Sequence, residues 1–70
     1  MGKFAKRLYE LRKEKRLSIR SLAKKVGVSP TSIVRYENSE CEPNFNNLEK
    51  MADLFGVSID YLLGRVDYDN

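Results

Sequence analysis

Thr31 and Arg35 are four positions apart, a spacing that places two side chains on the same face of a helix. An arginine guanidinium can donate two hydrogen bonds at once to the O6 and N7 atoms of guanine, and a threonine methyl group can contact the methyl group of thymine. Ile33 and Tyr36 fall on the opposite face, which we expect to be buried. The pattern predicts that Thr31 and Arg35 contact base edges in DNA. The alternative is that Arg35 is a solvated surface arginine.

These residues belong to the second of two short helices that the sequence predicts on either side of a tight turn. Apolar residues recur at helical spacing up to Val26. Gly27 suits the left-handed residue that follows a helix end, because it has no Cβ atom. Ser29 can cap the next helix, and Pro30 fits its first position, where no backbone N–H is needed. Helices joined in this way form a helix-turn-helix, which usually reads DNA.

The same apolar periodicity predicts three further helices and no strand. The five expected helices cover residues 3–15, 19–26, 30–38, 45–55 and 59–63. Ser18, Asn44 and Ser58 stand where helix caps are needed. The sequence therefore predicts an all-α domain over residues 1–64, followed by a polar C-terminal tail, residues 65–70, that frays.

The composition argues against catalysis and against a metal site. The chain has 70 residues, no histidine and one cysteine. It therefore lacks histidine general bases and the usual zinc-ligand patterns. No apolar run approaches 18 residues, so no membrane span is predicted. We expect a cytoplasmic protein that is not an enzyme, with no metal, cofactor, membrane or small-molecule ligand. We interpret Cys41, which lies between two acidic residues, as an incidental thiol and not as a redox sensor.

The charges are segregated along the chain. Residues 1–37 hold eleven of the thirteen Lys and Arg but only three of the ten Asp and Glu, a local balance of +8. Residues 38–70 have a balance of −5, and the chain as a whole carries +3. A basic half joined to an acidic half predicts one surface for a polyanion and another that faces elsewhere.

Taken together, these motifs resemble the DNA-binding domain of Cro/Xre-type repressors. The resemblance runs from about Phe4 to Gly64, and its most specific parts are LSIRSLAKKVGVSPTSIVRYEN and LEKMADLFGVSIDYLLG. It implies a compact five-helix, lambda-repressor-like fold with the helix-turn-helix in its second and third helices. It also implies control of transcription, as a repressor, by a homodimer bound to a palindromic operator in double-stranded DNA.

The resemblance also assigns roles to individual residues. The residues at its base-reading positions are Pro30, Thr31 and Arg35. The residues expected to meet DNA phosphates are Ser18, Ile19, Arg20, Ser32 and Asn38. Two features depart from the family: Ile19 replaces a frequent glutamine that holds a phosphate, and the loop after the recognition helix carries Glu40 and Glu42 where basic residues are usual.

Two further sets of residues follow from the pattern. Arg12 and Glu37 both fall on core faces, and because an isolated buried charge is costly we expect them to form a structural ion pair, as the family does. The expected dimer contact, weak without DNA, involves Ile59, Tyr61 and Leu62.

Two other functions fit the same pattern. The chain can be an antitoxin or another protein-binding helix-turn-helix module, although only six residues follow Gly64. It can also be the N-terminal DNA-binding domain of a longer repressor. The sequence favours a DNA-binding transcriptional regulator over both.

Overall fold

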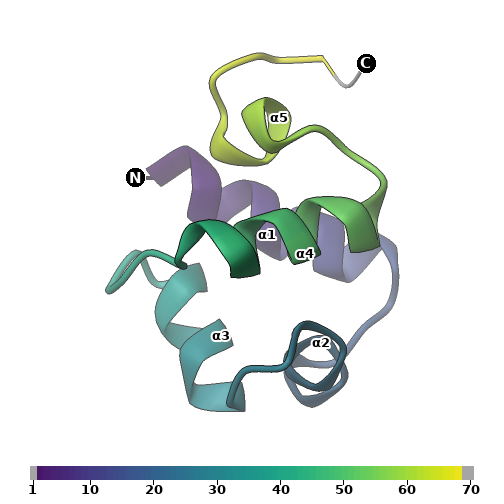
Figure 1. Cartoon of the computed structure of the whole chain (residues 1–70), viewed down its shortest axis with the longest axis vertical. Helices are drawn as coiled ribbons and strands as arrows, with labels where there is room; N and C mark the ends of the chain where they lie inside the picture. The colour runs from purple at the N-terminus through teal and green to yellow at the C-terminus, as the bar shows by residue number, and fades with distance from the viewer. Residues whose placement is uncertain (1, 69–70) are drawn as a thin grey trace.

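The computed structural model describes residues 2–68, which form five helices and no strand (Figure 1). The helices are α1 (Gly2–Glu14), α2 (Ile19–Val26), α3 (Pro30–Glu37), α4 (Phe45–Phe55) and α5 (Ile59–Leu63). The predicted all-α, five-helix fold is confirmed. Two helices differ at their bounds: α1 begins and ends one residue early, and α3 ends at Glu37 with Asn38 as its C-cap. None of these helices is long and apolar enough to cross a membrane.

Side chains placed just before α2, α3, α4 and α5 fix where these helices begin. Each accepts a hydrogen bond from a backbone N–H of the first turn, with donor–acceptor distances between 2.8 and 3.2 Å. The capping residues are Ser18, Ser29, Asn44 and Ser58. Such a cap stabilises a helix by about 1 kcal/mol relative to alanine. These starts are therefore determined locally, by residues adjacent in the sequence.

The turn between α2 and α3 depends on Gly27. Its φ of 86° lies in the left-handed region, which a residue with a Cβ atom rarely adopts. In this conformation the N–H groups of Gly27 and Val28 both donate to the carbonyl of Ala23, at 2.8 and 3.0 Å. Ser29 then caps α3 directly, so the two helices are joined by only three residues.

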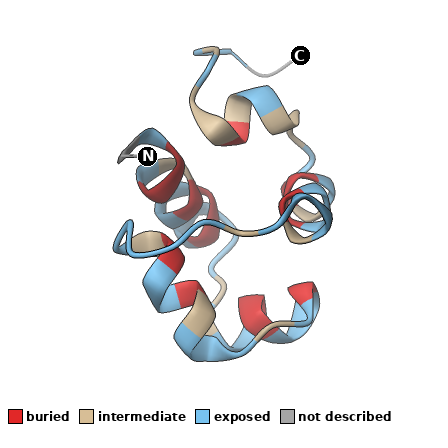
Figure 2. Ribbon diagram, turned by 60° about the vertical axis from the view of Figure 1, so that its left-hand side comes forward, coloured by how far each residue is buried: buried red, intermediate tan, exposed pale blue. Residues whose placement is uncertain are grey.

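One core holds the five helices together. Its residues lie on the inward sides of the helices, which leaves the outer sides exposed (Figure 2). The largest fully buried side chains are Leu8, Leu22, Ile33, Met51, Leu62 and Val26. Because every helix supplies at least one buried residue, the relative positions of α2 and α3 are fixed by the whole core.

The helices that carry the turn motif lie at one end of the molecule. α2 packs against α3, α1 packs against both α3 and α5, and α4 contacts α2 and α5. α5 and the described end of the chain therefore lie far from the turn between α2 and α3 (Figure 1).

Residues 65–68 fold back onto the helices. The Arg7 guanidinium donates to the carbonyl oxygens of Tyr61 at 2.6 Å and Val66 at 3.1 Å. It also lies 4.0 Å from the centroid of the Tyr61 ring and 3.4 Å from the Asp67 carboxylate. The expected polar tail thus begins with a segment that α1 holds in place, and its last two residues lie outside the described part of the chain.

Candidate nucleic-acid interface

The outward face of α3 carries the two side chains that the sequence singled out. Thr31 and Arg35 are exposed, whereas Ile33 is fully buried and Tyr36 is 5% exposed. Within residues 2–68 no side-chain hydrogen bond or ion pair engages Arg35. Its five N–H donors are therefore available to a ligand.

Sequence reasoning gave no role to Val34, which the structure places on the same exposed side. Its side chain is 42% exposed, next to the positions of Thr31 and Arg35 on the helix. Helical spacing alone places Val34 beside the outward face, because it lies three positions after Thr31 and one before Arg35. An apolar group there can contact thymine methyl groups.

The residues at the start of α3 are partly engaged with one another. The hydroxyl groups of Ser29 and Ser32 lie 3.0 Å apart, and Ser29 Oγ also accepts from the Ser32 backbone N–H at 3.2 Å. Pro30 is exposed at the first position of the helix. The Ser32 hydroxyl, expected at a phosphate, is thus half-buried and already close to a protein partner.

The start of α2 presents two exposed side chains, those of Ser18 and Arg20, beside its first backbone N–H groups. Ser18 is exposed and its hydroxyl accepts from the Ser21 N–H, and the Arg20 side chain is exposed. The Ile19 side chain is half-buried and packs against the core. Of Ile19, therefore, only the backbone N–H can serve a phosphate, through the partial positive charge of a helix N-terminus.

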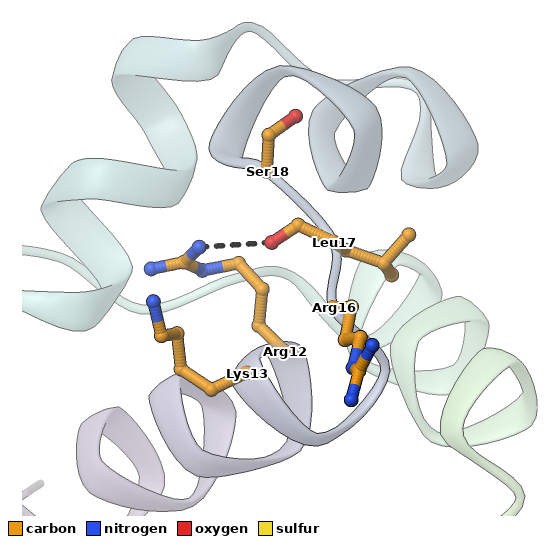
Figure 3. Close-up of a pocket in the computed structure, with 5 residues that line it drawn as sticks. All are labelled: Arg12, Lys13, Arg16, Leu17 and Ser18. Carbon is orange, nitrogen blue, oxygen red and sulfur yellow. Dashed lines mark hydrogen bonds between the residues drawn. The ribbon is translucent and has the colours of Figure 1, made fainter.

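Arg12 and Glu37 form a buried, two-pronged ion pair. Arg12 Nε donates to Glu37 Oε2 at 2.7 Å and Arg12 Nη2 donates to Oε1 at 3.2 Å, and the two side chains are 10% and 9% exposed. Arg12 Nη1 also donates to the carbonyl of Leu17 at 3.0 Å (Figure 3). One side chain of α1 thereby fixes both the end of α3 and the segment that enters α2.

The loop after α3 brings acidic groups beside a predicted phosphate contact. Asn38 is exposed, and its Nδ2 lies 3.4 Å from Glu40 Oε2. Glu42 and Cys41 are also exposed. No group of three potential metal ligands occurs within residues 2–68.

The surface expected to mediate dimer contact needs one correction. Ile59 and Tyr61 are half-buried, but Leu62 is fully buried. Leu62 faces the core because α5 packs on α1 and α4, so its side chain has no surface to offer a partner.

A different apolar residue is exposed on the second half of the chain. Phe45, the first residue of α4, is 68% exposed, although it shares the apolar spacing of Leu48, Ala52 and Phe55. Pro43, two positions before it in the sequence, lines a hollow of about 260 Å³. The other residues of this hollow are Phe4, Glu42, Leu48 and Leu63.

Known helix-turn-helix proteins are similar to this chain in sequence. The family model described as helix-turn-helix matches residues 8–62. The transcriptional regulator YobD of Bacillus subtilis is 38% identical over 64 residues, which are 91% of this chain and 57% of that protein. The phage CTXphi transcriptional repressor RstR of Vibrio cholerae is 40% identical over 90% of this chain and 56% of its own length. This chain thus spans about half the length of these relatives.

A solved structure shows the same fold in a complex with an operator. The P22 c2 repressor bound to a synthetic operator has a TM-score of 0.81 and 37% identity, over 84% of this chain and 89% of that one. The family match agrees with the structure, which has the same order of helices and a capped turn between α2 and α3. The chain belongs to the helix-turn-helix family of Cro/Xre-type repressor domains.

Proposed function

We propose that this chain is a sequence-specific regulator of transcription that binds double-stranded DNA, and that it acts as a repressor. The observation that carries the proposal is the outward face of α3, where Thr31 and Arg35 are exposed and Arg35 has no protein partner within residues 2–68. The names of the relatives support this reading, since RstR and the P22 c2 protein are repressors.

In the proposed complex α3 lies in the major groove. Arg35 donates two hydrogen bonds to a guanine, while Thr31 and Pro30 make apolar contacts with neighbouring bases. The short, capped connection between α2 and α3 supports this placement, because it leaves the exposed start of α3 free to approach base edges.

Phosphate contacts at the flanks hold this register. The N-terminus of α2 meets one phosphate through its first backbone N–H groups, and Arg20 adds a positive charge beside them. Ser32 and Asn38 contact further phosphates from α3 and its C-cap. Such contacts position the protein without reading sequence.

We further propose that two chains bind a palindromic operator. A single recognition helix contacts only a few base pairs, which is too few to define a site in a genome. The second half of the chain, with the exposed Phe45 and the half-buried Ile59 and Tyr61, supplies the self-contact. Residues 1–64 form the binding domain in this proposal. Because the relatives are longer than this chain, a role as the N-terminal domain of a larger repressor is the principal variant of it.

Selection of bound duplexes from a random pool tests the proposal directly. We expect enrichment of a pseudo-palindrome with half-sites about 34 Å apart, one helical turn. The Arg35→Ala variant is the matched control and should lose enrichment at one base pair in each half-site. If no sequence is enriched, the chain is not a specific regulator, and the interpretation as a protein-binding module takes its place.

A further inference from the structure

A hollow lies at the corner between α1 and α2. It has a volume of about 490 Å³ and is lined by Arg12, Lys13, Arg16, Leu17 and Ser18 (Figure 3). Three of these five residues carry a cation. The Glu37 carboxylate beside them is already neutralised by its ion pair with Arg12. The surface of the hollow therefore has a net positive charge.

Lys13 and Arg16 supply this charge. Both side chains are exposed, and neither forms an ion pair within residues 2–68. The Lys13 ammonium has one weak neighbour, the Tyr9 ring, whose centroid is 5.9 Å away. In Figure 3 the two side chains lie on opposite sides of the Arg12 stem, so they border the hollow from two directions.

The backbone of the corner determines where Arg16 is placed. α1 ends at Glu14, and Arg16 has a φ of 56°, in the left-handed region where glycine is usual. The N–H of Arg16 donates to Lys13 O at 3.0 Å and the N–H of Leu17 donates to Arg12 O at 3.1 Å, which closes the turn. A flexible cationic side chain thus occupies a position that the backbone would satisfy best with glycine.

The corner also adjoins groups that the proposed function assigns to DNA phosphates. Ser18, in the wall of the hollow, caps α2, whose first N–H groups are expected at a phosphate. Through Arg12 the hollow adjoins Glu37, which directly precedes Asn38. The Glu40 carboxylate lies 3.4 Å from the Asn38 side-chain amide. A DNA strand that passes Ser18 and Asn38 is therefore repelled by the acidic loop and attracted to the cationic corner.

We propose that this corner is a binding site for a backbone phosphate at the outer edge of each half-site, with Lys13 and Arg16 as its cations. The site rests on the proposed DNA-binding function and extends it. In this extension, cations at the end of α1 supply phosphate attraction that the acidic loop after α3 does not. Its contribution is independent of sequence, since phosphates carry no base identity. The competing role for the two cations is to interact with the partial negative charge at the C-terminus of α1.

The salt dependence of binding separates the two roles. Lys13→Gln and Arg16→Gly together remove both charges, and glycine at position 16 suits the left-handed backbone, so this double variant should fold. We expect the slope of log Kobs against log salt for the two-chain complex to become shallower by about 1.8, because one phosphate contact worth about 0.9 is lost in each half-site. The selected operator and unrelated DNA should lose affinity by similar factors. The control variant, Lys6→Gln with Lys3→Gln, removes two exposed charges elsewhere on α1 and should keep the wild-type slope.

The position of the phosphate is tested on the DNA. Neutral methylphosphonate linkages placed one at a time along the operator should weaken wild-type binding at one flanking phosphate in each half-site and leave binding by the double variant unchanged there. A double variant that keeps the wild-type salt slope but melts at a lower temperature would assign the cations to the helix end and overturn the site. If the wild-type chain itself binds no duplex DNA, the proposed function is overturned together with this site.

Discussion

Arg35 is the residue on which the proposed sequence specificity most depends. Arg12 and Arg35 have opposite environments. Arg12 is buried and donates hydrogen bonds from three N–H groups to Glu37 and Leu17. Arg35 is exposed, and its guanidinium donates no hydrogen bond within residues 2–68. A guanidinium with all its donors free, on the outward face of a helix, is arranged for a ligand that presents paired acceptors. Guanine presents such a pair in the major groove.

We predict that Arg35→Ala costs about 1–3 kcal/mol of binding free energy on the preferred operator and relaxes specificity at one base pair per half-site. Arg35→Lys is the informative control, because lysine keeps the charge but lacks the planar fork of donors. It should retain most of the affinity for unrelated DNA and lose discrimination at the same base pair. Titrations against single-base operator variants measure both effects. A uniform loss on every sequence would make Arg35 a phosphate contact.

At the scale of the elements, the Arg12–Glu37 pair adds a buried polar link between three segments that also share the core. It joins α1 to the end of α3, and through Leu17 O it joins α1 to the segment that enters α2. The hydrogen bonds of both charged groups are made inside the protein, and no buried side-chain polar atom within residues 2–68 lacks a partner. The pair therefore orients the two helices that the proposed function uses.

We predict that Arg12→Ala destabilises the fold by roughly 3–5 kcal/mol, because Glu37 would remain buried without its partner. That is a large share of the roughly 5–15 kcal/mol by which small domains are stable. Replacing both residues, Arg12→Met with Glu37→Leu, should restore much of the loss, because no buried charge remains. Thermal or urea denaturation of the three proteins measures the effect. A melting temperature of Arg12→Ala within a degree or two of wild type would show that the charges are solvated.

The loop after α3 opposes DNA binding in our interpretation. Glu40 is held beside Asn38, and Glu42 is exposed on the same loop. Replacing both with glutamine should tighten binding to any duplex, most clearly at low salt, where screening is weakest. Glu49→Gln with Asp53→Asn, on the exposed side of α4, makes the same change in net charge and should have a smaller effect. Equal affinities of wild type and the loop variant at low salt would mean that the loop points away from the duplex.

At the scale of the whole molecule, local signals made the fold predictable from the sequence. The caps and the apolar spacing of each helix act within a few residues, so the helix starts agree closely with those expected. The face of α3 was predictable because Ile33 and Tyr36 share one side of the helix and Ile33 is strongly apolar. The exposure of Phe45 and the burial of Leu62 were not, because both residues are apolar and only the packing of α4 and α5 decides which one is covered. The contact of Arg7 with Val66 likewise joins residues 59 positions apart, beyond any local pattern.

The last prediction concerns assembly on DNA. A 70-residue chain has little apolar surface to spare beyond its core, so we expect a weak dimer that the operator stabilises by mass action. Sedimentation should show mostly monomer at low micromolar concentration and two chains per operator once DNA is added. Phe45→Ser should leave the melting temperature nearly unchanged, because the side chain is 68% exposed, and should weaken the two-chain complex. Tyr68→Ser, at an aromatic residue that is 61% exposed in the C-terminal segment, is the matched control and should leave the complex intact. One chain per operator, bound to an asymmetric site, would rule out the dimer.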